Sequence, residues 1–111
     1  MTIDDLRRRI DELDERLVQL LNERAACALE IGKLKHALHM EVYQPDREAE
    51  VLRHVRACDE RIAGPLGATA ITRLFERIID EARRIERATA RGDGSLVEEQ
   101  ANIARVMRID D

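Results

Sequence analysis

A single arginine, Arg24, interrupts an apolar pattern in the first forty residues. Apolar side chains recur there at alternating spacings of four and three, as on one face of a long helix; they are Leu6, Ile10, Leu13, Leu17, Leu20, Cys27, Ile31, Leu34 and Leu38, called the seam below. The spacing predicts an apolar residue where the chain has Arg24. An unpaired cation in a dry core would cost several kcal/mol. Arg24 therefore needs an acid from a neighbouring helix or an anionic ligand.

A second cation, Lys35, follows on nearly the same helix face. It lies within about 20° of the direction of Arg24 and about 16 Å further along the axis. Between them Ala28 is small and Gly32 has no side chain, although glycine inside a helix costs about 1 kcal/mol. A close approach of a ligand or of another backbone would justify Gly32. The two cations suggest a pocket for an anion; the alternative is that Arg24 pairs with a structural acid and Lys35 is a solvated surface residue.

Three further residues carry charges that could serve such a pocket. Arg47 and Glu48 follow Pro45 at the start of a predicted helix, where free N–H groups favour anions. Glu86 ends an otherwise apolar stripe on a third predicted helix, made of Ile71, Leu74, Phe75, Ile78, Ile79, Ala82 and Ile85. The plain alternatives are ordinary helix capping at residues 45–48 and a frayed helix end that leaves Glu86 in solvent.

Three main helices must position these residues. We expect them over residues 2 to about 40, 45 to about 62 and 68 to about 91, with a turn at 64–67. A helical domain over 1–91 is followed by a C-terminal extension over 92–111, which is expected to form a short fourth helix after Ser95 or a partly ordered tail. The first helix would be about 58 Å long, far longer than a compact domain of this size. It must therefore find partners beyond its own chain.

Composition agrees with an all-α protein. The 111 residues include one Phe, one Tyr and no Trp, and the net charge is -4. This charge and the lack of stacking aromatics exclude a nucleic-acid partner, and no apolar run is long enough to span a membrane. Cys27 and Cys58 fit no metal-ligand spacing and are expected to be buried small apolar residues. We therefore expect a cytoplasmic protein without a metal site.

The chain resembles the all-helical class of chorismate mutases, in its single-domain, dimeric type. The resemblance rests on an ordered set of motifs between residues 3 and about 90: LRRRI at 6–10, LD at 13–14, LLNER at 20–24, IGKLK at 31–35, PDRE at 45–48, ITRLF at 71–75 and II at 78–79. It implies an isomerase of phenylalanine and tyrosine biosynthesis in the shikimate pathway. Such an enzyme converts chorismate, a dicarboxylate, to prephenate by an intramolecular Claisen rearrangement without a cofactor.

The resemblance also implies roles for particular residues. Arg7 and Arg24 would hold carboxylates, and Lys35 would bridge a carboxylate and the ether oxygen. Arg47 would support the anionic side of the substrate and Glu48 would receive its hydroxyl. The catalytic set would be Arg24, Lys35 and Glu86, and the substrate-binding set would add Arg7, Gln44, Arg47, Glu48 and Ala82.

Three of these positions depart from the common pattern of the family. Glu86 stands where many members have Gln, and only a protonated carboxyl could donate a hydrogen bond to the ether oxygen. Activity should then fall as Glu86 ionises with rising pH. Ala82 stands where a hydroxyl residue is common and Gln44 where an acid is common, which affects secondary substrate contacts.

Helix geometry adds an expectation about assembly. Arg7 and Lys35 would be about 42 Å apart along one straight helix, so they cannot share a small ligand within one chain. Arg7 must come from a partner, which agrees with the intertwined homodimer of the family. Two rival functions are an isochorismate pyruvate-lyase of the same fold and a non-catalytic helical interaction module. The resemblance also allows a complex with another enzyme of the aromatic pathway.

Overall fold

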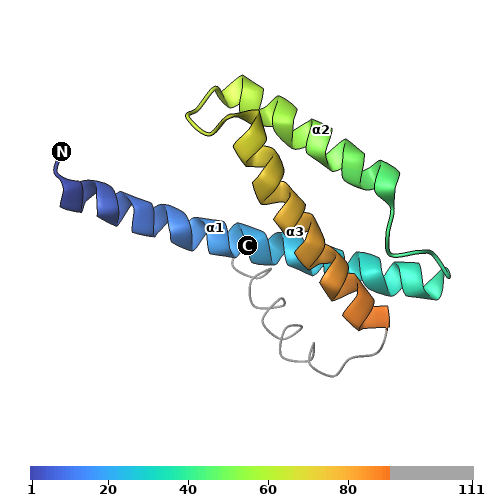
Figure 1. Cartoon of the computed structure of the whole chain (residues 1–111). Helices are drawn as coiled ribbons and strands as arrows, with labels where there is room; N and C mark the ends of the chain where they lie inside the picture. The colour runs from blue at the N-terminus through green and yellow to red at the C-terminus, as the bar shows by residue number, and fades with distance from the viewer. Residues whose placement is uncertain (91–111) are drawn as a thin grey trace.

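The computed structural model describes residues 1–90, and within this range it contains three helices and no strand (Figure 1). They are α1 (Ile3–Ala37), α2 (Pro45–Ile62) and α3 (Gly67–Ala90). The expected all-α fold with one very long N-terminal helix is therefore confirmed. The predicted fourth helix and the extension over 92–111 lie outside the described residues.

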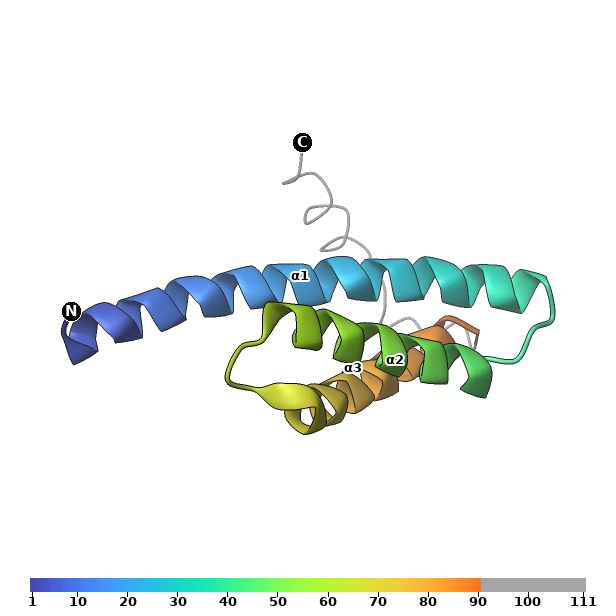
Figure 2. The ribbon, with the colours of Figure 1, turned by 90° about the horizontal axis from the view of Figure 1, so that it is seen from above.

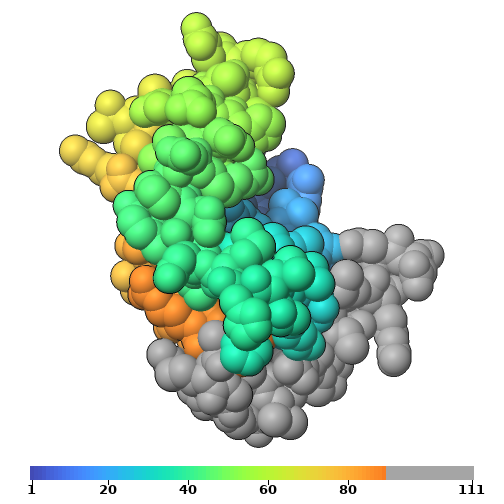
Figure 3. Space-filling view, turned by 90° about the vertical axis from the view of Figure 1, so that its right-hand side faces the viewer, coloured from blue at the N-terminus to red at the C-terminus, as the bar shows by residue number. Residues whose placement is uncertain are grey.

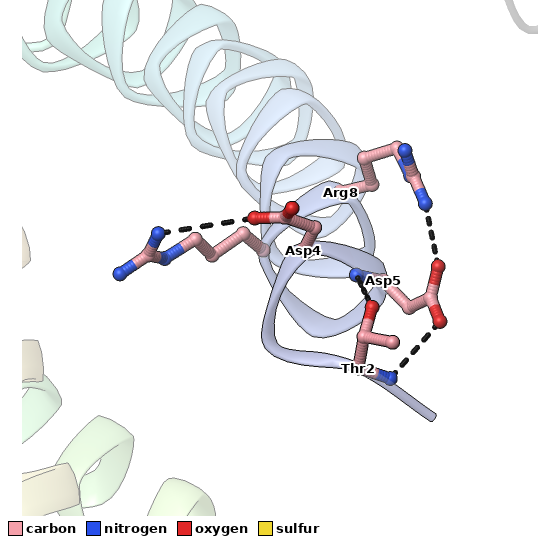
Figure 4. Close-up of polar contacts among 5 residues, drawn as sticks. Thr2, Asp4, Asp5 and Arg8 are labelled. Atoms are coloured by element: carbon pink, nitrogen blue, oxygen red, sulfur yellow. Dashed lines mark hydrogen bonds and ion pairs between the residues drawn. The ribbon is translucent and has the colours of Figure 1, made fainter.

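The start of α1 is fixed by a reciprocal capping box (Figure 4). The Thr2 hydroxyl accepts a hydrogen bond from the Asp5 backbone N–H at 3.1 Å, and the Asp5 carboxylate accepts one from the Thr2 N–H at 3.0 Å. The bond from the Thr2 backbone, followed by the contact with Arg8, lowers the pKa of Asp5. Two N–H groups that the helix leaves unpaired are thereby satisfied.

The end of α1 comes at Ala37, three residues before the predicted Met40. His39 has a positive φ of 57°, the Met40 N–H bonds to the Lys35 carbonyl at 2.8 Å, and the His39 N–H bonds to the His36 carbonyl at 3.2 Å. This pair of bonds is a Schellman ending, which usually places glycine at the left-handed position. The sequence has His39 there, so no glycine marks the true end of the helix.

The ends of α2 and the start of α3 follow from local signals. Pro45 occupies the first turn of α2, where its missing N–H costs nothing. Ala63 ends α2 in the left-handed conformation, with its N–H bonded to the Asp59 carbonyl at 2.8 Å. Gly67, with φ at 82°, then begins α3. The predicted bounds of these two helices agree with the structure to within one residue.

The helix α3 packs against both α1 and α2 and so joins the three helices. Figures 1 and 2 show α3 crossing the C-terminal half of α1, while the N-terminal part of α1 extends beyond the other two helices. The core at this crossing consists of Leu29, Ile85 and Ala88, with Ala25 packed against them. A Cβ atom at Gly32 would lie 2.8 Å from the Cα atom of Glu86. The backbone of α3 is therefore the close neighbour that justifies Gly32.

The apolar seam of α1 is largely exposed on this single chain. Large side chains along it are between about a third and two thirds exposed, namely Leu6, Ile10, Leu13, Leu17, Leu20, Ile31, Leu34 and Leu38. The predicted burial of both cysteines is wrong, because Cys27 is exposed and Cys58 is half-buried. Leu74 of the α3 stripe is also exposed. Cys27 lies on the exposed seam. The helix α3 packs instead against a neighbouring face of α1, which carries Ala25, Leu29 and Gly32. Among the helices over residues 1–90, none combines the length and the apolar character needed to cross a membrane.

Candidate active site

A pocket of about 470 Å³ lies where all three helices and the loop 38–44 meet. It brings together seven of the eight predicted site residues: Arg24, Lys35, Gln44, Arg47, Glu48, Ala82 and Glu86. Figure 3 views the molecule from the end of α1, where the last turns of α1, the loop and the first turns of α2 form one continuous surface, coloured teal to green. The short loop positions the start of α2 beside the end of α1, so cations from both helices line one cavity.

Lys35 and Glu86 form a buried ion pair across the contact between α1 and α3. The Lys35 Nζ lies 2.9 Å from Glu86 Oε1, and the two side chains are 14% and 9% exposed. Lys35 also donates a hydrogen bond to the carbonyl of Val42 at 2.9 Å, which ties the loop to α1. The alternatives of a solvated Lys35 and a frayed Glu86 are therefore both wrong.

Arg24 forms no ion pair within residues 1–90, although it is partly buried. Burial lowers the pKa of this guanidinium, and the nearby charge of Arg47 lowers it further. Two like charges that face one pocket favour an anion between them. No acid of residues 1–90 pairs with Arg24, which leaves its guanidinium able to bind an anionic ligand.

The start of α2 supplies Arg47 and Glu48 to the pocket, while Gln44 stands just before the helix. Arg47 makes an exposed contact with Glu50 at 3.3 Å, which is worth little in solvent. The Gln44 side-chain amide donates to the carbonyl of Glu41 at 2.9 Å rather than capping the helix. The N–H groups at the start of α2 thus have no side-chain cap from Gln44.

Arg83 is a pocket residue that the sequence analysis missed. Its Nε lies 3.1 Å from Glu48 Oε2, its Nη2 lies 2.6 Å from Asp80 Oδ1, and its guanidinium carbon lies 5.5 Å from the centre of the Tyr43 ring. A signal was present, because Arg83 lies four residues after Ile79 and three before Glu86, on the same helix face. The run of charges around it concealed this position.

The remaining wall of the pocket is apolar or weakly polar. It consists of Cys27, Ala28, Ile31, Met40, Val42, Val51 and Ile79. Cys27 and Ile31 belong to the seam already recognised in the sequence. Met40 and Val42 lie in the loop, where no helical periodicity could predict which side chains face the cavity.

The charges of the pocket match a small dianion. Arg24, Lys35, Arg47 and Arg83 give four positive charges and Glu48 and Glu86 give two negative ones, so the formal charge is +2. Glu86 is matched by Lys35 and Glu48 by Arg83, which leaves the positive charge around Arg24 and Arg47 for a ligand. No group of three or more potential metal ligands occurs in residues 1–90. The arrangement can bind and orient a dicarboxylate and stabilise negative charge that develops on it.

Arg7 lies outside the pocket of its own chain. Its side chain is 75% exposed near the start of α1, with its Nη1 3.9 Å from Asp4 Oδ1. This placement agrees with the distance argument that Arg7 cannot share a ligand with Lys35 of the same chain.

Fold and pocket together define an all-helical protein with a cation-rich pocket between its three helices. The family model for chorismate mutase type II matches residues 6–87. The chain therefore belongs to the chorismate mutase type II family, as its motifs indicated.

Curated relatives with this similarity are larger proteins. The chain is 40% identical over 86 residues to a bifunctional chorismate mutase/prephenate dehydratase of Stutzerimonas stutzeri, which covers 73% of this chain and 23% of the relative. It is 42% identical over 77 residues to the protein of the same name from Escherichia coli (strain K12), covering 69% and 19%. It is 35% identical over 78 residues to the T-protein of Haemophilus influenzae, covering 70% and 20%. The chain thus spans about a quarter or less of the length of these relatives.

Proposed function

We propose that this protein is a chorismate mutase, an isomerase that converts chorismate to prephenate. The observation that carries the proposal is the half-buried Arg24, which forms no ion pair with residues 1–90 and lines, together with Arg47, a pocket that also holds the Lys35–Glu86 pair. The names of the relatives that match this chain support the same reaction. We further infer a role in phenylalanine and tyrosine biosynthesis.

The reaction needs positioning and electrostatic stabilisation rather than a nucleophile. Within one chorismate molecule the ether C–O bond breaks while a C–C bond forms, so no atom or electron is exchanged with the protein. Arg24 and Arg47 bind the carboxylates and hold the substrate in a compact, chair-like conformer. Lys35 and Glu86 lie where they can act on the ether oxygen, on which negative charge builds. Glu48 accepts the substrate hydroxyl, and Gln44 and Ala82 complete the wall.

The site is completed, in this proposal, by Arg7 of the partner subunit. Because 28 residues separate Arg7 from Lys35, they lie about 42 Å apart along α1. Antiparallel pairing of two α1 helices would bury the exposed seam and bring the Arg7 end of one helix to the pocket of the other. The assembly is thus an intertwined homodimer with two sites, each lined by both chains.

We place this enzyme in the cytoplasm, because Cys27 and Cys58 are both free thiols in the structure. We also infer a functional link to another enzyme of the aromatic pathway, because the relatives that match this chain are named as joining chorismate mutase to prephenate dehydratase.

The first test is chorismate consumption, followed by its ultraviolet absorbance, with wild type, Arg24→Ala and the control Arg53→Ala. Arg53 is an exposed arginine of α2 outside the pocket. We expect wild-type turnover, a loss of about 10²–10³ in kcat/KM for Arg24→Ala, and no loss for Arg53→Ala. Consumption of isochorismate instead would identify the lyase, and inactivity on both substrates would identify an interaction module, in which Arg24→Leu should raise Tm.

A further inference from the structure

Arg83 connects three segments around the pocket, and nothing in the proposed mechanism yet uses it. From α3 its guanidinium reaches Glu48 on α2 at 3.1 Å and Tyr43 in the loop at 5.5 Å to the ring centre. Asp80, one turn earlier on α3, holds its Nη2 at 2.6 Å. The side chains of Arg83 and Glu48 are 27% and 23% exposed, so their contact is largely shielded from water. A cation with this many fixed contacts is held in one place.

This geometry leaves Glu48 one oxygen for a ligand. Arg83 contacts Oε2 of the carboxylate, and an ionised carboxylate has a second acceptor oxygen. Glu48 lies in the first turn of α2. Arg24 and Arg47 line the same pocket, and either could attract the Glu48 carboxylate if Arg83 did not hold it. Pairing of Glu48 with Arg24 would neutralise the charge that a substrate carboxylate needs.

We propose that Arg83 is a positioning residue that holds Glu48 in place. In this position Glu48 Oε1 accepts a hydrogen bond from the substrate hydroxyl, and Arg24 remains free to bind a substrate carboxylate. This inference rests on the proposed function. Arg83 itself contacts no reacting atom and acts through Glu48. Its planar fork suits the task because it holds Glu48 and Asp80 with different nitrogens.

The test is a double-mutant cycle in the full chain with Arg83→Ala, Glu48→Gln and the double variant. We expect Arg83→Ala to lower kcat/KM for chorismate about tenfold, mainly through a higher KM, since a binding contact and the free charge of Arg24 are lost together. In the Glu48→Gln background, Arg83→Ala should lower kcat/KM by less than about twofold, because no carboxylate is left to position. Arg83→Lys should recover part of the loss.

The control is Arg84→Ala, which removes the neighbouring arginine of α3. Arg84 pairs with Glu81 at 2.9 Å on an exposed face and does not line the pocket, so its loss should leave kcat/KM unchanged. Equal losses from Arg83→Ala in both backgrounds would overturn the positioning role, and so would a loss explained by a lower Tm alone. Wild-type inactivity on chorismate and isochorismate would instead overturn the proposed function, and this inference with it. A failure of the positioning role is therefore seen in the variants, whereas a failure of the proposed function is seen in the wild type.

Discussion

Glu86 is the residue whose charge state matters most for the proposed reaction. Its contact with Lys35 at 2.9 Å is one that an ionised carboxylate makes. An ionised carboxylate beside the ether oxygen would repel the negative charge that develops there, whereas a protonated carboxyl could donate a hydrogen bond. The contact between Lys35 and Glu86 must therefore loosen when the substrate binds, because the substrate oxygens draw Lys35 toward them.

Glu86→Gln tests this role of the side chain. The variant supplies a permanent N–H donor for the ether oxygen and removes the negative partner of Lys35, so its kcat for chorismate should equal or exceed that of the wild type. The measurement is kcat and KM of both proteins, with Tm as the control for folding. A lower kcat at unchanged Tm would contradict the assignment.

Residue types that break a pattern were predictable, and those that continue a charged run were not. Arg24 and Glu86 were recognisable because each interrupts an apolar series, and both line the pocket. Arg83 was not predicted because charged residues surround it on α3, and its inward position depends on how α3 packs against α1 and α2. Met40 and Val42 were not predicted because the loop has no helical periodicity.

At the scale of the elements, the crossing of α1 and α3 depends on Gly32. A Cβ atom there would meet the Cα, Cβ and Cγ atoms of Glu86 at 2.8, 3.2 and 3.3 Å. The first of these is a backbone atom, which cannot rotate away, so the two helices would have to separate. Gly32 thus positions Glu86 relative to Lys35, three residues further along α1.

Gly32→Ala should therefore destabilise the protein despite the better helix propensity of alanine. Overpacking costs about 1–3 kcal/mol against a gain of about 1 kcal/mol from propensity, and the shift of Glu86 should also lower kcat/KM. Gly64→Ala is the matched control, because its new Cβ atom would meet its nearest neighbour at 3.9 Å. It should be neutral or stabilising by up to about 1 kcal/mol. Urea unfolding and kcat/KM of both variants check this, and an equal or higher stability for Gly32→Ala would contradict the close approach.

Helix bounds were predictable where local residue types form a recognisable capping signal. Thr2 with Asp5 begins α1, and Pro45 begins α2. The end of α1 was placed too late because Leu38 continues the seam, while the left-handed turn at His39 has no glycine to announce it. The burial of Cys27 was predicted from its residue type, but burial depends on which face of α1 is covered, and this single chain leaves that face open.

For the whole molecule, the central question is what covers the N-terminal part of α1. Its seam residues Leu6, Ile10, Leu17 and Leu20 are about half exposed on one chain, and a protein seldom leaves such a row of large apolar side chains in water. The same part of the helix carries Arg7, which the pocket of its own chain cannot use. One antiparallel pairing of two α1 helices would satisfy both requirements.

This assembly predicts complementation between two inactive variants. Arg7→Ala and Arg24→Ala should each lose most of their activity as homodimers, because every site then lacks one of its carboxylate-binding cations. When equal amounts are unfolded together and refolded, half of the dimers should be mixed, and each mixed dimer should have one site with both arginines and one with neither. About a quarter of the wild-type activity should return.

The result distinguishes a site shared between chains from a site within one chain. If Arg7 and Arg24 served the same chain's pocket, every pocket in the mixture would lack one of them, and mixing would restore nothing. Refolding each variant alone is the control, since it repeats the treatment without forming mixed dimers. Activity that returns only in the mixture would mean that the exposed seam pairs two chains and that each chain supplies Arg7 to the pocket of the other.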